Sequence, residues 1–164
     1  MKPHEKEEIN KFKKIIEEIK TGMLFTHSDK EGLKGRPMNT AKVDEGCNLW
    51  FFTSENSNHF HHICKNKEVF VNYTNSETDT CTVVTGKAFL TRDINRINEM
   101  YSPVIKTWFP GGINDPGLLL IRVEPINIEY WSNDNYKIDR SSITAGSFVS
   151  NQVSKRITEE LLFH

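Results

Sequence analysis

Hydroxyl, amide and imidazole side chains gather within seven residues in the first half of the sequence. Thr53 ends an apolar run, and Ser57, Asn58 and His59 follow where helical spacing begins. A helix N-terminus offers unpaired backbone N–H groups and positive potential, so this turn suits a phosphate group. Arg36 lies in the preceding predicted strand, and a guanidinium matches phosphate oxygens in a bidentate manner. These residue types predict a phosphate site formed by Arg36 and the turn.

The same residues also have ordinary structural interpretations. Ser57 is a suitable helix N-cap, which requires no ligand. Arg36 could equally be a surface residue of its strand. Taken alone, the residue types favour the cap over the ligand.

A second candidate feature is aromatic. Residues 108–112 read Trp-Phe-Pro-Gly-Gly, and Tyr130 and Trp131 end a later apolar run. Large aromatic side chains beside a turn can present flat apolar faces to a planar ligand. For Trp108 and Trp131 the alternative is packing in the core or in a dimer interface.

Three neighbouring histidines invite a metal interpretation. His59 and His62 would share one face of a helix, with His61 between them. No acidic or cysteine partner stands at a recognisable spacing, so we expect no metal site.

Composition narrows the class of protein. The 164 residues suit one domain. With 21 basic and 22 acidic residues, the net charge is close to zero and creates no strong electrostatic attraction to nucleic acid or to an anionic membrane. No apolar stretch approaches the roughly 20 residues of a membrane helix, and the N-terminus lacks a signal-peptide core. Cys47, Cys64 and Cys81 are odd in number and widely spaced, which favours reduced thiols. A cytoplasmic protein that binds neither nucleic acid nor membrane is expected.

Hydrophobic periodicity predicts the elements that position these groups. Helices are expected over residues 5–20, ending near Gly22, and over residues 57–65 and 92–101. Strands are expected over residues 23–27, 36–43, 48–53, 69–73, 81–90, 118–123 and 126–131, with Pro125 marking a bend or an edge position. The pattern predicts a mainly β, antiparallel barrel or sandwich. We expect a main domain over residues 1–140 and a helical extension over residues 141–164.

An ordered series of motifs resembles the pyridoxamine 5'-phosphate oxidase-like flavin proteins. It runs through Arg36-Pro37-Met38, Leu49 to Thr53, Ser57, Ile63, Asn66, Val69 and Gly86-Lys87-Ala88. Residues 108–112, Asp115-Pro116 and Glu129-Tyr130-Trp131 resemble the branch called general stress protein 26-like. The resemblance covers residues 5 to 131. It implies an FMN-binding antiparallel split barrel of six or seven strands, working as a homodimer with each flavin held between two subunits.

The resemblance implies cofactor-binding roles for twelve residues and identifies no catalytic residue. The phosphate would be bound by Arg36 and by the turn Ser57, Asn58 and His59, with Phe52 and Thr53 bordering flavin and phosphate. Along the isoalloxazine ring would lie Pro37, Met38 and Asn39, with Cys81 from the sheet, Trp131 from the other subunit and Trp108 lining the cleft.

The chain departs from the family pattern at functional positions. Relatives commonly carry a lysine, often after an arginine, where this chain has Asn58-His59. A mostly neutral histidine holds phosphate less strongly, which predicts reduced or pH-dependent FMN affinity. Ala41 replaces a lysine that the pyridoxamine 5'-phosphate oxidases have near the flavin, and their arginine and histidine signature is absent after Trp131. We do not expect pyridoxamine 5'-phosphate oxidase activity.

Two functions fit this resemblance. The first is an FMN-dependent oxidoreductase that passes electrons from a reduced nicotinamide to a small acceptor, with the cofactor supplying the chemistry. The alternative is a stress protein that binds or buffers flavin without rapid turnover.

Overall fold

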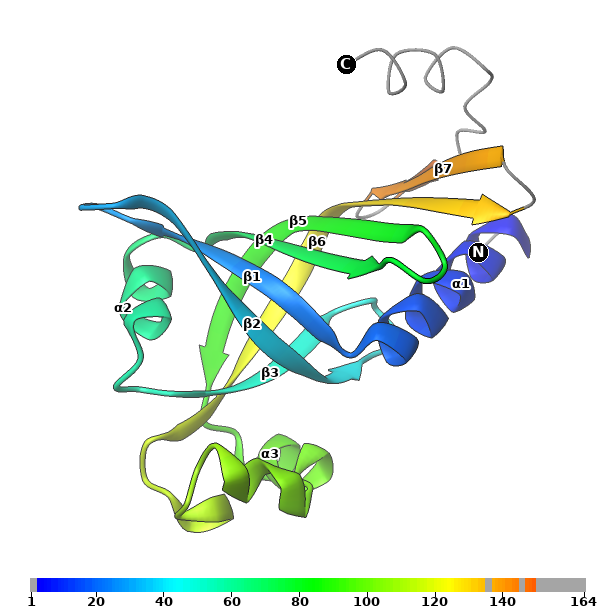
Figure 1. Ribbon diagram of the computed structural model, residues 1–164. Coiled ribbons are helices and arrows are strands. Elements are labelled where there is room, and N and C mark those ends of the chain that lie inside the picture. Colours follow the sequence, from blue (N-terminus) through cyan, green and yellow to red (C-terminus); the bar gives the residue numbers. More distant parts are fainter. Residues whose placement is uncertain (1–2, 135–136, 145–146, 150–164) are drawn as a thin grey trace.

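The computed structural model describes residues 3–134, 137–144 and 147–149, which form a mainly β structure (Figure 1). The helices are α1 (Pro3–Ile19), α2 (Asn58–Lys65), α3 (Ile94–Met100) and the 3-10 helices η1 (Pro103–Thr107) and η2 (Gly112–Asn114). The strands are β1 (Thr21–Ser28), β2 (Gly32–Val43), β3 (Leu49–Ser54), β4 (Glu68–Asn75), β5 (Thr80–Thr91), β6 (Leu118–Asp134), β7 (Lys137–Thr144) and β8 (Ser147–Val149).

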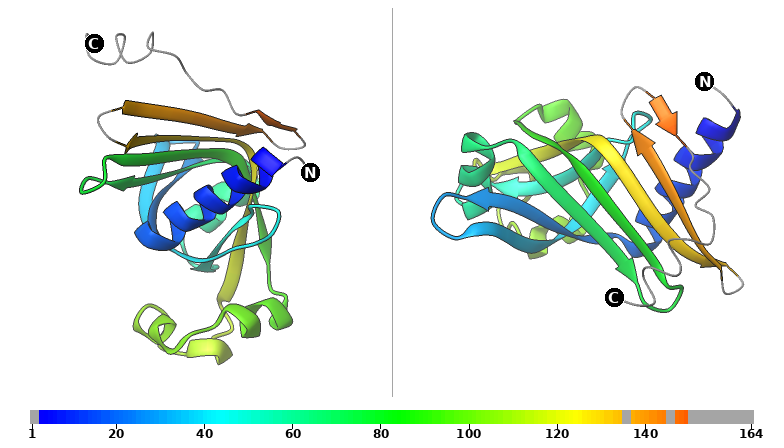
Figure 2. Two further views of the ribbon diagram at one scale, coloured as in Figure 1. Left: turned by 90° about the vertical axis from the view of Figure 1, so that its right-hand side faces the viewer. Right: turned by 90° about the horizontal axis from the view of Figure 1, so that it is seen from above.

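Six antiparallel strands close into a barrel. Their order is β3-β2-β1-β4-β5-β6, and β6 returns to pair with β3, from Leu49 opposite Val123 to Ser54 opposite Leu118. β7 and β8 extend the sheet from β6 beyond the barrel (Figure 2). The predicted mainly β, antiparallel barrel is confirmed.

The barrel wall is split between β2 and β3. These two strands pair only where Thr40 to Val43 of β2 meet Leu49 to Phe51 of β3. From Gly32 to Asn39, β2 pairs with β1 alone. α2 starts shortly after β3 and packs against β1 and β5, at the opposite end of the barrel from α1 (Figure 1). The split therefore lies near the start of α2.

β6 is one continuous strand where the sequence predicted two. Its pairing with β5 shifts register between Thr85 and Gly86, which absorbs Pro125 without ending the strand. A Cβ atom on Gly86 would lie 2.4 Å from the carbonyl oxygen of Glu124, so only glycine permits this approach. The predicted break between residues 123 and 126 was wrong.

The main core fills the barrel and continues beneath α1. Phe12 of α1 is fully buried, and Ile9 and Ile16 lie on the same face of the helix. Burying an apolar side chain of this size contributes roughly 1.5–3 kcal/mol. The helix ends at Ile19 because Lys20 adopts a left-handed conformation with φ of 63°, and Gly22, the predicted end, lies inside β1.

A smaller core lies on the outer face of β3 and β6. Trp50 and Leu120 are buried there under Ile97 and Met100 of α3. Asp93 caps α3 by accepting hydrogen bonds from two backbone N–H groups, so the helix predicted over residues 92–101 is present as Ile94–Met100. This core anchors α3 and η2 to the outside of the barrel.

The C-terminal part of the described chain consists of strands. The predicted domain boundary at residue 140 falls inside β7, and residues 141–144 and 147–149 are strands. Residues 150–164, which hold most of the predicted helical extension, lie outside the described residues. No helix in the described ranges is long and apolar enough to cross a membrane.

Candidate functional site

Polar side chains from four elements meet near the split in the barrel wall. They are Thr26 of β1, Arg36 of β2, Thr53 of β3, and His59 and His62 of α2. Thr26, Thr53 and His59 are buried, which is unusual for polar groups unless each finds partners. The sequence prediction that joined Arg36 to the turn before α2 named three of these five residues.

Ser57 forms the N-cap of α2. Its hydroxyl accepts a hydrogen bond from the backbone N–H of Phe60 at 3.2 Å and donates one to the carbonyl of Ser54 at 2.7 Å. The structural interpretation of Ser57 is thus confirmed. Asn58, the next residue of the predicted phosphate turn, is exposed.

His59 is buried and hydrogen-bonded on one side of its ring. Nε2 lies 2.5 Å from the hydroxyl oxygen of Thr53 and 3.3 Å from that of Ser57. Nδ1 is buried and has no hydrogen-bond partner among the described residues. Burial first, and then the nearby Arg36 and His62, lower the pKa of His59 to about 3.

The imidazole of His59 is therefore neutral at physiological pH. A neutral imidazole holds phosphate less strongly than a lysine, so the expected reduced or pH-dependent FMN affinity stays a prediction.

His62 and Thr26 complete the cluster, although neither was predicted from the sequence to belong to it. Nδ1 of His62 lies 2.9 Å from the hydroxyl oxygen of Thr26. The spacing of His59 and His62 on one helix face was visible in the sequence. The contact with Thr26 was not, because it depends on how α2 packs against β1.

Arg36 lies in the split and has no partner within the described chain. It sits opposite Leu24, whose side chain is fully buried in the barrel, so Arg36 is on the inner side of β2. The guanidinium is half-buried, and burial lowers its pKa while leaving it cationic. Neither a hydrogen bond nor an ion pair joins Arg36 to any other described residue.

Strand alternation separates the four predicted residues of β2. Arg36 and Met38 face inward, where Met38 packs against the core, whereas Pro37 and Asn39 are exposed on the outer face. The hydroxyl of Thr21 donates to the side-chain oxygen of Asn39 at 2.7 Å. The structure thus does not bring residues 36–39 onto one surface.

Cys81 and Trp131 lie side by side on the same outer face as Pro37 and Asn39. They are directly opposite each other in β5 and β6, and both are partly exposed. Met23 of β1 shares this face and is 39% exposed. The outer surface formed by these residues of β1, β2, β5 and β6 is therefore partly apolar and partly exposed in a single chain.

Phe52 and Trp108 belong to the α3 side of the molecule. Phe52 packs against the smaller core, on the face of β3 opposite to Thr53. Trp108 follows η1 and is 69% exposed. Among the described residues, no hydrogen bond, ion pair or ring contact joins either residue to Arg36.

The described residues contain no group of three or more histidine, cysteine, aspartate or glutamate side chains placed to hold a metal ion. The three cysteines are free thiols. Burial, with smaller contributions from Asp44 and Glu45, raises the pKa of Cys47 to about 11 despite the opposing effect of Lys13, so this thiol stays protonated.

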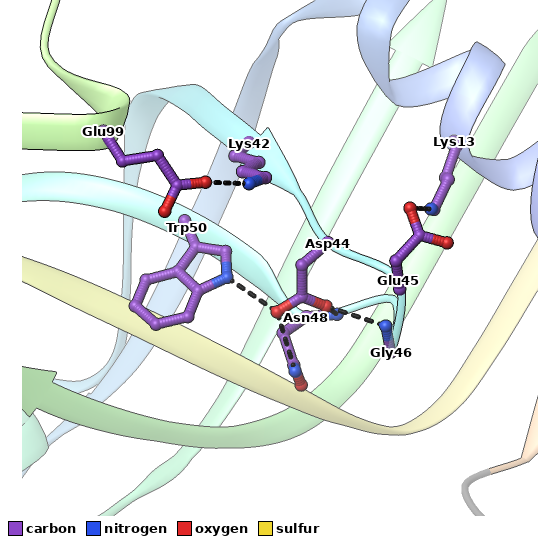
Figure 3. A network of polar contacts seen from close by, with 8 residues as sticks. All are labelled: Lys13, Lys42, Asp44, Glu45, Gly46, Asn48, Trp50 and Glu99. Atoms are coloured by element: carbon purple, nitrogen blue, oxygen red, sulfur yellow. Dashed lines mark hydrogen bonds and ion pairs between the residues drawn. The ribbon is translucent and has the colours of Figure 1, made fainter. Parts of the chain in front are cut away.

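A second polar network occupies the turn between β2 and β3 (Figure 3). The carboxylate of Asp44 accepts from the backbone N–H groups of Gly46 and Asn48, both at 2.9 Å. It also accepts from the Asn48 amide at 3.0 Å and from the Trp50 indole at 2.9 Å. Lys42 pairs with Glu99 beside it. Both oxygens of Asp44 are occupied, so this network has a structural role.

Comparison with known proteins places the fold in a described family. The family model described as pyridoxamine 5'-phosphate oxidase like matches residues 7–155. No curated protein matches the sequence.

Solved structures agree with this match. General stress protein 26 from Bacillus anthracis is 26% identical, with a TM-score of 0.66 over 77% of this chain and 93% of that one. The general stress FMN/FAD binding protein from Xanthomonas citri is 21% identical, with a TM-score of 0.64 over 91% and 96%. A pyridoxamine 5'-phosphate oxidase-related, FMN binding protein from Nostoc punctiforme is 10% identical, with a TM-score of 0.68 over 94% and 98%.

Proposed function

Because the chain belongs to the pyridoxamine 5'-phosphate oxidase-like family, we propose that it is a flavoprotein that binds FMN at the split between β2 and β3. Similar structures from Xanthomonas citri and Nostoc punctiforme are described as flavin-binding, which supports the proposal.

The unpaired guanidinium of Arg36 carries this proposal. A half-buried cation normally finds a carboxylate or several acceptors, since leaving it unpaired costs free energy. The charge of Arg36 lowers the pKa of His59, and Nδ1 of His59 is also buried without a partner among the described residues. A phosphoryl group would supply oxygen acceptors for the guanidinium, and the start of α2 would add backbone N–H groups. The residues present therefore fit the phosphate end of FMN.

The outer sheet face suits the flavin ring and a second copy of the chain. Pro37, Asn39, Cys81 and Trp131 share this face with Met23, and a planar apolar ring can cover such side chains. In the proposed homodimer each flavin lies between two subunits, and Trp131 reaches the flavin of the other one. Met38, Phe52 and Trp108 would complete the surroundings from the inner side of β2 and from the α3 side.

We propose an oxidoreductase function, for which bound FMN would supply the redox chemistry between a reduced nicotinamide and a small acceptor. The chain binds and orients the cofactor and limits access of water to it. The buried, neutral His59 is unsuited to act as a general base near pH 7. Free thiols among the described residues fit a reducing compartment, and we propose the cytoplasm.

Flavin binding is tested by adding FMN or riboflavin to the purified protein and following flavin fluorescence. We expect FMN to bind at least about tenfold more tightly than riboflavin, because only FMN carries the phosphate. Equal affinities would contradict the phosphate assignment.

Turnover is tested separately with the FMN complex. Sustained oxidation of NADH or NADPH with a quinone or dye acceptor supports the oxidoreductase. A stoichiometric reaction that then stops, or none, supports a protein that stores flavin.

The proposed dimer is tested by sedimentation velocity. Met23→Glu places a charge on the outer sheet face and should yield monomers. Val104→Glu is the matched control, because Val104 is exposed on η1, away from that face. Monomeric wild-type protein would contradict the dimer.

A further inference from the structure

We propose that Arg92 is a positioning residue for the flavin site, because it joins the loop before α2 (residues 55–57) to the turn before β6 (residues 115–117). This inference rests on the proposed FMN-binding function and extends it to residues outside the site described above. It also gives a role to Gly111 and to Asp115-Pro116, motif residues that the proposed flavin site does not use.

Arg92 contacts two segments that are far apart in the sequence. Its Nη1 donates to the main-chain carbonyl of Pro116 at 2.7 Å, and its Nη2 pairs with the carboxylate of Glu55. Arg92 itself lies between the end of β5 and Asp93, the N-cap of α3. One side chain therefore connects the loop before α2, the turn before β6 and the start of α3.

The turn before β6 is held in shape by its own residues. The Asp115 carboxylate accepts from the backbone N–H of Gly117 at 2.9 Å, and the Asp115 carbonyl accepts from the N–H of Leu118 at 3.1 Å. A Cβ atom on Gly111 would lie 2.9 Å from the Cβ of Asp115, so a larger residue at position 111 would displace the turn. The turn thus fixes the carbonyls of Pro116 and Gly117, and both of them accept hydrogen bonds.

The loop before α2 is supported from two sides at its first residue. Glu55 donates its backbone N–H to the carbonyl of Gly117 at 3.0 Å, while its side chain pairs with Arg92. Two residues later Ser57 caps α2, and its N–H and hydroxyl both donate to the carbonyl of Ser54, at 3.0 and 2.7 Å. The position of the α2 N-terminus therefore depends on the end of β3 and on how Glu55 is held.

The exposure of the ion pair points to a local role and not to a global one. The side chains of Arg92 and Glu55 are 49% and 42% exposed, and an exposed ion pair adds little to the free energy of unfolding. A side chain that bridges three segments can still limit the local opening of a loop. A loop that is already ordered loses less conformational entropy when a ligand binds. Arg92 should therefore affect ligand binding more than stability.

FMN titration of two arginine variants tests this role. Arg92→Met removes both contacts and keeps the length of the side chain, so FMN binding should weaken about fivefold. Arg96→Met is the matched control, because the Arg96 side chain is also 49% exposed but pairs with Asp93 and stacks on Trp50. This control should lose some stability with the stacking contact and keep wild-type FMN affinity. Equal losses of FMN affinity in the two variants would overturn the inference.

The contribution of Glu55 is tested with a double-mutant cycle. Glu55→Gln removes the charge that pairs with Arg92 and should weaken FMN binding about threefold. In the Arg92→Met background the same change should cause no further loss, because the partner is already absent. Additive losses would show that the two residues act separately, which contradicts the inference.

The order of the loop is measured without any ligand. Hydrogen exchange in the flavin-free protein follows the backbone N–H groups of Glu55 and Ser57, which bond to Gly117 and Ser54. Both should exchange about fivefold faster in Arg92→Met and at the wild-type rate in Arg96→Met. Unchanged exchange in Arg92→Met would overturn the inference.

The two proposals fail in different ways. If wild-type protein binds no FMN, the proposed function itself fails, and the inference fails with it. If wild-type protein binds FMN and Arg92→Met binds it equally well, only the positioning role of Arg92 fails.

Discussion

The turn between β2 and β3 and the first turn of α2 are both polar and partly buried, but their hydrogen bonds are completed differently. In the β2–β3 turn, the chain itself supplies four donors to the carboxylate of Asp44. Beside α2, Arg36 and Nδ1 of His59 have no partner among the described residues. A complete network holds a fold together, whereas an incomplete one marks where a ligand contributes. The two turns should therefore respond oppositely to mutation.

The largest expected effect concerns stability at the β2–β3 turn. Asp44→Ala removes four hydrogen bonds and leaves the buried Trp50 indole N–H unpaired, which should lower the free energy of unfolding by about 3 kcal/mol. Urea unfolding followed by circular dichroism measures this change. FMN affinity of the folded fraction should stay at the wild-type value. A selective loss of FMN binding would mean that the two turns do not have separate roles.

The second prediction concerns Arg36 at the split, where FMN affinity should change and stability should not. Arg36→Met keeps the length of the side chain and removes the charge, so FMN binding should weaken about 30-fold, or about 2 kcal/mol. Stability should change by less than about 0.5 kcal/mol, because no partner within the described chain is lost. Flavin titration and urea unfolding of one preparation compare the two quantities. A large loss of stability would show that Arg36 has a structural partner.

As pH falls, the two turns should lose their contributions to stability in different pH ranges, beginning with His59. His59 has a folded pKa of about 3, below its ordinary value of 6.5, so the unfolded chain binds the extra proton first. Stability should fall as pH drops below about 6.5, by on the order of 1 kcal/mol per pH unit. His59→Asn should remove this slope in unfolding experiments between about pH 7 and about pH 4.5. An unchanged slope in this variant would contradict the lowered pKa.

Asp44 should act in a lower range of pH. Burial tends to raise the pKa of its carboxyl group, but hydrogen bonds from Trp50, Asn48 and Gly46 outweigh burial and lower it. Its stabilising effect is therefore present above its ordinary pKa of 3.8 and is lost as pH falls through the lower folded value. The acid slope that remains in His59→Asn should begin in this lower range.

The smallest expected effect concerns Trp108, which belongs to neither turn. The side chain is 69% exposed, so Trp108→Ala should change stability by less than about 0.5 kcal/mol. If the indole borders the flavin as proposed, FMN binding weakens about threefold. Val104→Ala, an exposed residue of the same segment, should change neither quantity. Wild-type FMN affinity in Trp108→Ala would remove Trp108 from the site.

Local patterns predicted most of the elements but not how they join. The helical spacing of Ile9, Phe12 and Ile16 identified α1, and the predicted strands 23–27, 36–43, 48–53, 69–73 and 81–90 lie within the observed β1 to β5, apart from Asn48. β7 was missed because its sequence is polar, and it forms by pairing with the edge that β6 offers beyond the barrel. Such pairing depends on a neighbour that local sequence does not reveal.

The candidate site was predictable in part. The alternation of a strand already implied that Arg36 and Met38 face away from Pro37 and Asn39. Of the two interpretations of Ser57 that the sequence left open, the N-cap is confirmed and the role in binding phosphate stays a prediction. The burial of His59 and its contact with Thr53 were not foreseeable, because they arise only when α2 closes over the end of the barrel.

The pairing of β3 with β6 also constrains the order of events during synthesis. Residue 49 pairs with residue 123, so the barrel cannot close until the ribosome has released most of the chain. Until then β3 has one unpaired edge, and unpaired strand edges favour association with other chains. Such long-range closure is also slow compared with helix formation. A nascent chain that pauses before β6 would thus be a natural client for a chaperone that shields strand edges.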